Sequence, residues 1–148
     1  MNIISFTVPG QPQGKGRARV GKIGNHARMF TPAKTVAYEG LIAHAAHVAM
    51  AGAPIITGPV DVNVKIECQV PASWSKKKQR MALANLVHPI TKPDADNVLK
   101  AVFDGMNGVV WKDDCQVVNC LATKRYSETP SVTVHAWPLT AQEQEPAA

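Results

Sequence analysis

The sequence predicts an α+β fold, in which a mixed, largely antiparallel sheet of about four strands carries two main helices and a basic flap. Three observations predict this class. One segment alternates apolar and polar residues at every position, and two others repeat apolar residues at helical steps. The elements follow in the order strand, helix, strand, flap, helix, strand, strand. Strict alternation is typical of a sheet with one buried and one solvated face, so the helices are expected on one face only.

The N-terminal part predicts one strand, one loop and one helix. Residues 3–8 place apolar side chains on one face, as a strand does, whereas residues 9–25 combine glycine, proline and cations without periodicity and indicate a loop. Thr31 followed by Pro32 is a common helix start, because a capping hydroxyl precedes a proline in the first turn. We therefore expect a helix over 32–51. Its expected apolar face consists of Tyr38, Leu41, Ile42, Ala45, Val48 and Ala49.

The remaining elements follow the same logic. The clearest strand is 60–70, "VDVNVKIECQV", and the basic segment within 71–91 is expected to form a short helix or a mobile flap. Apolar residues at four-residue steps predict a second core helix over 96–106. Residues 115–126 and 131–139 are expected to be two strands that pair with each other through the short turn between them.

The length of 148 residues predicts a single domain over 1–138, followed by a disordered tail over 139–148 that lacks core-forming residues. No run approaches about 18 apolar residues, so no membrane helix is expected. The N-terminus has neither a charged leader nor a cleavage site. Three cysteines without a CxxC spacing, Cys68, Cys115 and Cys120, predict reduced thiols, and together these features favour a cytoplasmic protein. Cys68 is expected in the core.

Cations gather in two parts of this basic chain, whose net charge is +5. No acidic residue precedes Glu39, although six lysines and arginines do, and a second cluster lies just after residue 75. Such patches usually bind phosphate backbones, and the alternative is a solvated face that keeps the protein soluble. Two separate clusters favour nucleic acid. The candidate DNA-binding residues are Lys15, Arg17, Arg19, Arg28, Lys76, Lys77, Lys78 and Lys92.

Residues 92–117 concentrate negative charge, since five of the eleven acidic residues of the chain lie here. Asp94 and Asp96 follow Pro93 at the expected start of a helix, where backbone N–H groups stabilise a carboxylate. An ordinary aspartate cap explains one of these residues. It does not explain two of them together with the second pair, Asp113 and Asp114. Such pairs repel each other unless a lysine, a metal ion or water lies between them.

Lysine and aspartate also alternate along the expected helix. Lys100 lies four residues after Asp96 and four before Asp104, which allows an ion-pair ladder worth tenths of a kcal/mol per pair. That reading suffices for Asp104. For Lys100 it competes with a second reading, an ammonium held ready for a phosphate oxygen. Asp113 and Asp114 follow "GVVWK", and for Asp113 a simple turn residue is an equally good interpretation.

Metal-dependent phosphoryl transfer would join these features. Mg²⁺ prefers oxygen ligands and is typically held by one or two carboxylates, waters and substrate phosphate. A nearby lysine adds charge stabilisation in the transition state. Asp94, Asp96 and Asp114 as ligands, with Lys100 as the cation, would meet this need. In that case the three carboxylates should converge within a few ångström of one another.

The order D-x-D-N-x-x-K followed by W-x-D-D-x-Q-V, in "KPDADNVLKAVFDGMNGVVWKDDCQV", resembles the pattern of RusA-type Holliday junction resolvases. These are small endodeoxyribonucleases of bacteria and their phages. The segments "VPGQPQGKGRAR", "FTP" and "PASWSKKK" are also similar to that family, so the likeness covers about residues 3–136. The segment 71–91 is longer than in the shortest members, which leaves the role of the flap open.

The resemblance implies a homodimer that binds four-way DNA junctions and nicks two strands symmetrically, with Mg²⁺ or Mn²⁺ at carboxylates. By position, the essential aspartates of the family fall on Asp94, Asp96 and Asp114, and its essential lysine on Lys100. Asp113 matches a commonly acidic position, which makes it a further candidate metal ligand. Asn97 matches the family asparagine, and orienting a ligand or capping the helix are both open for it.

Two other interpretations compete with this one. A non-catalytic DNA-binding protein would use the aspartates as caps and ion pairs, and would not depend on a divalent ion. A nuclease of the same chemistry could instead act on flaps or replication forks. Among the aromatic residues, Trp74 could stack on a base or dock the flap, but an ordinary hydrophobic anchor is the expectation. Trp111 and Trp137 are expected to lie in the core or a dimer interface. His44 and His47 are expected to be exposed.

Overall fold

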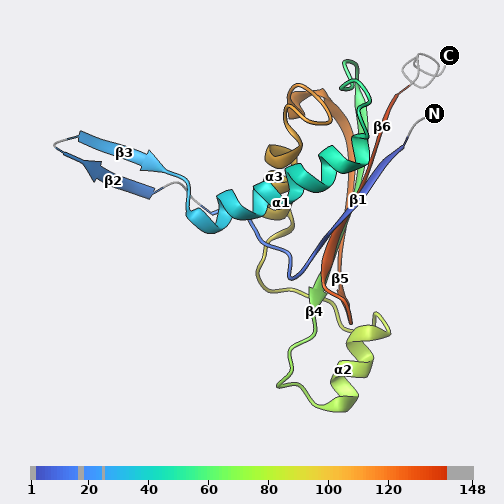
Figure 1. The fold of residues 1–148 in the computed structure, drawn as a ribbon. Coiled ribbons are helices and arrows are strands. Elements are labelled where there is room, and N and C mark those ends of the chain that lie inside the picture. The colour runs from blue at the N-terminus through green and yellow to red at the C-terminus, as the bar shows by residue number, and fades with distance from the viewer. Residues whose placement is uncertain (1–2, 17–18, 25, 140–148) are drawn as a thin grey trace.

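The computed structural model describes residues 3–16, 19–24 and 26–139. A four-stranded sheet has the order β1-β6-β4-β5, and a separate two-stranded sheet consists of β2 and β3 (Figure 1). The predicted α+β class and the mixed, mostly antiparallel sheet are confirmed. The elements are β1 (Ile4–Pro9), β2 (Arg19–Ile23), β3 (His26–Phe30), α1 (Ala33–Met50), β4 (Val60–Gln69), α2 (Lys76–Leu83), α3 (Ala95–Met106), the short 3₁₀ helix η1 (Asp114–Gln116), β5 (Val117–Ser127) and β6 (Ser131–Pro138).

Strand β4 forms the centre of the core, because it pairs antiparallel with β6 on one side and parallel with β5 on the other. Its alternating sequence has the expected effect: Val62, Val64 and Ile66 are fully buried, whereas Asn63 and Lys65 on the other face are half-buried. Helices α1 and α3 lie on the same side of the sheet (Figure 1) and cover the buried face. Cys68 is buried there, as predicted.

Helices α1 and α3 pack closely because Gly105 of α3 leaves no side chain between them. A Cβ atom at Gly105 would lie 2.7 Å from Cγ2 of Ile42 in α1. The buried face of α1 consists of Thr35, Tyr38, Ile42, Ala46 and Met50. The predicted inward positions Leu41 and Val48 are therefore wrong: they are 55% and 62% exposed.

The helix start was also misplaced by one residue. Pro32, and not Thr31, occupies the N-cap position of α1, and no side chain caps the helix. The first turn is instead closed by backbone bonds, in which the N–H groups of Thr35 and Val36 donate to the carbonyl of Pro32.

The prediction of a loop over 9–25 is wrong in its second half, because β2 and β3 form an antiparallel hairpin with Val20 opposite Met29. The hairpin projects away from the body of the molecule (Figure 1). Val20 and Met29 share one face of this hairpin and are 69% and 65% exposed. The described apolar side chains on this face are therefore not buried, which explains why periodicity did not indicate these strands.

The expected pairing of the last two strands is wrong as well. Strands β5 and β6 lie on opposite sides of β4, which separates them in the sheet. β5 runs parallel to β4, and such a pair needs a long crossover connection, which residues 70–116 with α3 provide. β6 instead pairs with β1 and β4, both antiparallel.

The basic flap is a helix, α2, capped by the Ser75 hydroxyl, which accepts a hydrogen bond from the Lys78 N–H at 3.2 Å. Trp74 anchors it as predicted, since its ring meets that of Tyr126 in β5 edge-on with centroids 5.3 Å apart. Leu139, the first residue of the predicted tail, donates its N–H to the carbonyl of Pro59 at 3.0 Å. The rest of the tail, 140–148, lies outside the described residues. No helix in the described ranges is long and apolar enough to span a membrane.

Candidate active site at the start of helix α3

Helix α3 begins directly after Asp94, which occupies its N-cap position in an extended conformation. The Asp94 carboxylate does not bind the backbone N–H groups of the first turn, so it is not an ordinary cap. Among the described residues, its one side-chain hydrogen bond is a long one, 3.5 Å, donated by the side-chain amide of Asn97. Both Asp94 and Asp96 are exposed. Two carboxylates are thus presented to solvent at the positive end of the helix dipole.

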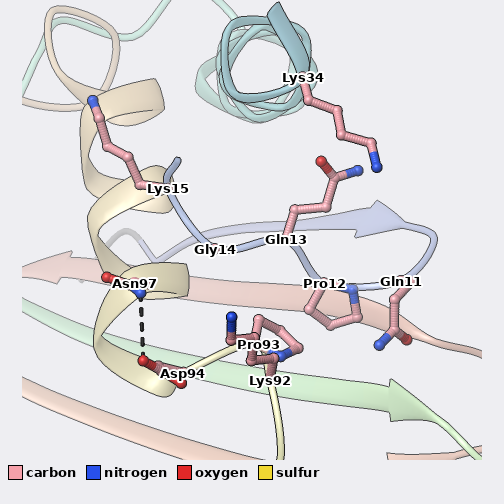
Figure 2. A pocket seen from close by; sticks show the side chains of 10 residues that line it. All are labelled: Gln11, Pro12, Gln13, Gly14, Lys15, Lys34, Lys92, Pro93, Asp94 and Asn97. Carbon is pink, nitrogen blue, oxygen red and sulfur yellow. Dashed lines mark hydrogen bonds between the residues drawn. The ribbon is translucent and has the colours of Figure 1, made fainter. Parts of the chain in front are cut away.

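A cavity of about 450 Å³ opens beside Asp94, between the start of α3 and the loop that follows β1 (Figure 2). Lys34 from α1 and Lys92 from the preceding segment add two ammonium groups to its rim, and neither forms an ion pair with a described carboxylate. A third lysine, Lys15, also lines the cavity. The remaining lining residues are Gln11, Pro12, Gln13, Gly14, Pro93 and Asn97. A carboxylate with surrounding cations and amides suits a phosphate group near a hydrolytic centre.

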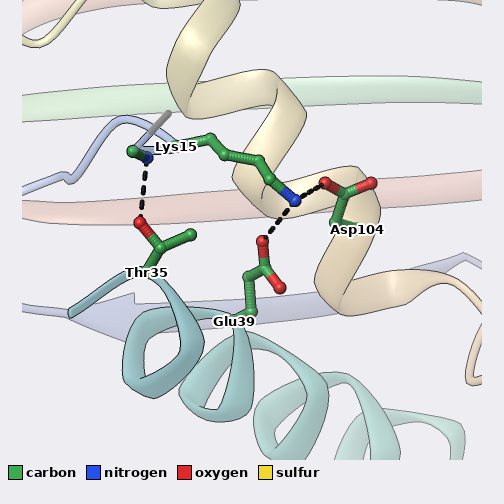
Figure 3. A network of polar contacts seen from close by, with 5 residues as sticks. Lys15, Thr35, Glu39 and Asp104 are labelled. Atoms are coloured by element: carbon green, nitrogen blue, oxygen red, sulfur yellow. Dashed lines mark hydrogen bonds and ion pairs between the residues drawn. The ribbon is translucent and has the colours of Figure 1, made fainter. Parts of the chain in front are cut away.

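Lys15, a candidate DNA-binding residue, is held between helices α1 and α3 (Figure 3). Its ammonium group pairs with Asp104 of α3 and with Glu39 of α1, 3.0 Å from Oε1 of the latter. The hydrogen bond accepted by Asp104 is the main reason why the pKa of Lys15 is raised above its usual value of 10.5. Two carboxylates thus neutralise the charge of Lys15, which ties the loop to both helices.

Backbone contacts reinforce this loop. The Lys15 N–H donates to the carbonyl of Asn97 at 3.0 Å, and the Gly16 N–H donates to the Thr35 hydroxyl at 2.9 Å. Gly14 lies so close to Asn97 that a Cβ atom there would be 3.0 Å from its side chain. The loop is therefore fixed against the first turn of α3, which forms one wall of the cavity.

Lys100 lies on α3 one turn after Asp96, and its side chain is exposed. The predicted ladder does not form: Asp104 pairs with Lys15, and no ion pair links Lys100 with a described carboxylate. Because Lys15 occupies Asp104, the charge of Lys100 stays available for an anion from outside the chain.

The second aspartate pair lies in and before η1. Asp113 caps this turn, because its carboxylate accepts the Cys115 N–H at 3.4 Å. Hydrogen bonds, first from the Cys115 side chain and then from its backbone, lower the pKa of Asp113 below the usual 3.8. The predicted turn role of Asp113 is thus supported, whereas the half-buried Asp114 has no described hydrogen bond through its carboxylate.

Gln116 fixes this turn, and sequence reasoning gave it no role. Its Oε1 accepts the N–H groups of Lys112 and Asp113 at 2.9 and 3.3 Å. Its Nε2 donates to the carbonyls of Ile56 and Gly58 at 2.8 and 3.0 Å. The pattern W-x-D-D-x-Q-V therefore contains two residues that anchor the turn with its aspartates, and Gln116 is one of them. The other anchor is the fully buried Trp111, as predicted for the core.

The predicted convergence of the three carboxylates is not present in the single chain. Among the described residues, no group of three or more Asp, Glu, His or Cys side chains could hold a metal ion. Asp94 lines the cavity, whereas Asp96 and Asp114 do not. The donor type still fits Mg²⁺, because exposed carboxylate oxygens are its preferred protein ligands and one or two of them suffice with water and phosphate.

The other candidate DNA-binding residues lie on two extensions, the β2–β3 hairpin and α2 (Figure 1). Arg17 falls outside the described residues, and Arg19 and Arg28 belong to β2 and β3 without described side chains. On α2, Lys76 and Lys77 are exposed, and the ammonium of Lys78 lies 3.9 Å above the Trp74 ring. Lys34, which lines the cavity, was not among the predicted DNA-binding residues, although the sequence already placed this lysine in the first turn of the predicted helix.

Comparison with known proteins places the chain among nucleases. The family described as "Endodeoxyribonuclease RusA" matches residues 9–136. A protein of Bacillus subtilis (strain 168), "Uncharacterized protein YqaN", is 42% identical over 138 residues, which is 90% of this chain and 95% of that protein. The family match over residues 9–136 includes the cavity, α3, η1 and both extensions.

Proposed function

The chain belongs to the RusA endodeoxyribonuclease family, and from that premise we propose that it resolves four-way DNA junctions by metal-dependent, paired symmetric nicks, in DNA recombination and repair. One observation supports the proposal most directly. Asp94, Asp96 and Lys100, the acidic and basic positions of the family pattern, are all exposed within the first two turns of α3. A core helix that displays two carboxylates and a lysine without an ion pair is poorly explained by folding alone.

The residues of the chain would divide the work as follows. Lys34 and Lys92 at the cavity rim would hold phosphates of the bound strand, and Lys100 would offset the charge that develops on the cleaved phosphate. In the hydrolysis, a P–O bond forms to the oxygen of water and the bond to the 3′-oxygen breaks, which leaves a 5′-phosphate and a 3′-hydroxyl. The loop held by Lys15 would keep the cavity in place during this reaction.

The candidate ligands of the Mg²⁺ ion, for which Mn²⁺ would substitute, are Asp94, Asp96, Asp114 and Asp113. Because no three of the described carboxylates converge, one or two of them would hold the ion together with water and substrate phosphate. When bound, such an ion polarises the phosphoryl group and lowers the pKa of bound water. Asp113 is the weakest candidate of the four, because its carboxylate already accepts the hydrogen bonds that cap η1.

We also propose that the protein acts as a homodimer. Two symmetric nicks require two active sites related by a twofold axis, which a symmetric dimer supplies. Exposed apolar residues on the outer side of α1, among them Val36, Leu41 and Val48, would be consistent with a covered helix face. Light scattering with chromatography should give twice the mass of 15.9 kDa.

The test is cleavage of a synthetic four-way junction and of a linear duplex of the same sequence, with Mg²⁺ and with EDTA. Paired nicks should appear on the junction only, and disappear with EDTA and in Asp96→Asn protein. Asp61→Asn is the matched control, because the Asp61 carboxylate accepts a hydrogen bond from Asn119 on the sheet and is not a candidate site residue; this variant should cleave normally. Tight binding without cleavage under any divalent ion would refute the nuclease and leave a DNA-binding protein. If flaps or forks are cleaved as well as the four-way junction, the substrate is branched DNA in general and not the junction specifically.

A further inference from the structure

A second groove, which shares no lining residue with the cavity at Asp94, lies where residues 85–88 pass the edge of the sheet beside β5. Its volume is about 430 Å³, and it is lined by side chains of β4, of β5 and of this segment. Three of them are cationic, Lys65, Lys124 and Arg125, and none of its described lining residues is acidic. Asn63 and Thr123 add neutral hydrogen-bonding groups.

The register of the strands explains why these cations gather. Lys65 of β4 lies opposite Thr123 of β5, and Arg125 follows two residues later, so Lys65 and Arg125 share the sheet face that α1 and α3 leave open. Lys124 lies on the opposite face, from where its ammonium donates to the carbonyl of Thr91. Three cations thus surround the β5 edge from both faces.

The cations keep most of their capacity for an external anion. An ammonium group has three donors, and the described structure uses one of those of Lys124. Arg125 has one ion pair, in which Nε lies 3.7 Å from Glu67, and its side chain is 45% exposed. This distance is long for a charge-assisted bond, and the ends of the guanidinium group are left for other acceptors.

The groove is connected with the candidate active site. Thr91, the residue that Lys124 binds, lies three residues before Asp94, so their Cα atoms are at most about 11 Å apart. One DNA strand advances about 3.4 Å per nucleotide along the helix axis. A strand cut at Asp94 would therefore reach the groove within a few nucleotides, and it would then continue towards the basic helix α2, which contacts β5.

From this arrangement we propose that the groove binds the phosphate backbone of a DNA arm close to the cleavage point, through Lys65, Arg125 and Lys124. The proposal rests on the proposed nuclease function and adds a contact surface to it. Backbone contacts of this kind position the DNA without reading its sequence. The groove would thus link the active site to α2, so that one arm is held along a continuous basic path.

The test is junction binding in EDTA, measured by fluorescence anisotropy across a series of KCl concentrations. Each lost phosphate contact lowers the slope of log K against log[salt] by about 0.9. The double variant Lys65→Gln/Arg125→Gln should therefore bind several-fold more weakly, with a slope smaller by about 1.8. Lys65→Arg/Arg125→Lys keeps both charges and should restore most of the slope. Glu67→Gln, which frees Arg125, should bind at least as tightly as the wild type.

Two outcomes would overturn the proposal. If the double variant binds with the wild-type salt slope while the wild type cleaves junctions normally, the groove does not bind DNA, and the proposed nuclease function still stands. If the double variant changes the molecular mass of the protein in solution but leaves the salt slope unchanged, the groove is a contact between protein chains and not a DNA-binding surface. If the wild type neither binds nor cleaves junctions, the proposed function itself fails, which the same assay reveals before any variant is compared.

Discussion

Replacement of Gln116 tests whether the second aspartate pair is positioned by the turn that contains it. Gln116→Ala removes four hydrogen bonds, two to backbone N–H groups and two to backbone carbonyls. The bond to Ile56 is partly buried and the other three are exposed, so each bond is worth about 0.5 kcal/mol, at the lower end of the usual range. The free energy of unfolding should fall by about 2 kcal/mol, which leaves a protein of ordinary stability folded.

Activity should respond more strongly than stability. Without Gln116, η1 loses its connection to residues 56–58, and Asp114 shifts with it. A displacement of about 1 Å at a catalytic group can cost about a hundredfold in rate. We expect junction cleavage to fall at least about tenfold, whereas the affinity for the junction in EDTA stays unchanged because no cation is lost.

The assays are urea unfolding and single-turnover cleavage at saturating protein. Gln116→Glu keeps the acceptor for Lys112 and Asp113 but places a carboxylate against the carbonyls of Ile56 and Gly58, so it should be no more active than Gln116→Ala. Asn119→Ala, nearby on β5, removes a single hydrogen bond and serves as the control. Wild-type cleavage by Gln116→Ala, together with the expected loss of stability, would show that the turn does not position Asp114.

Two further predictions concern the packing of α1 and α3. Lys15→Met should lower the free energy of unfolding by about 1–2 kcal/mol without changing the salt slope of junction binding, because the Lys15 ammonium already pairs with Glu39 and Asp104 within the chain. The pKa of Lys15 is raised on folding, so this stabilisation is complete below pH 10.5 and is lost as the pH rises through the higher folded pKa; the stabilities of wild type and variant should therefore converge at high pH. A reduced salt slope would instead return Lys15 to the DNA contacts. Gly105→Ala should destabilise by about 1–3 kcal/mol in thermal unfolding, because its Cβ meets Ile42, whereas Gly40→Ala, with open space around it, should stabilise the helix by about 0.5–1 kcal/mol; equal effects of the two would contradict the close packing.

Local patterns predicted the elements that bury one face. The alternation along β4 and the four-residue steps along α3 depend on a single buried face, which the sequence displays directly. Helix α1 is apolar on several sides, so the pattern identified the helix but could not select its inner face, and Leu41 and Val48 were placed inward wrongly.

Strand partners were harder to predict, because they depend on distant parts of the chain. β5 and β6 are separated by a short turn, which is typical of a hairpin, and yet β4 lies between them. The helix between β4 and β5 gave a usable signal, since a helical crossover favours a parallel pair. The β2–β3 hairpin had a signal too, the Gly24-Asn25 dipeptide, but its described apolar residues Val20 and Met29 are exposed, so periodicity did not detect the strands.

In the candidate site, too, features that depend on local sequence were predicted, whereas contacts between distant parts of the chain were not. The positions after Pro93 predicted two carboxylates at a helix start, and the fold presents both to solvent. Spacing also suggested that Lys100 pairs with Asp104, but Lys15, 89 residues away in sequence, binds that carboxylate instead. Lys15 from the N-terminal loop thereby fixes one wall of the cavity. Because Lys15 binds Asp104, Lys100 has no ion pair with a described carboxylate. The network in Figure 3 thus couples the folding of the N-terminal loop to the charge at the proposed site.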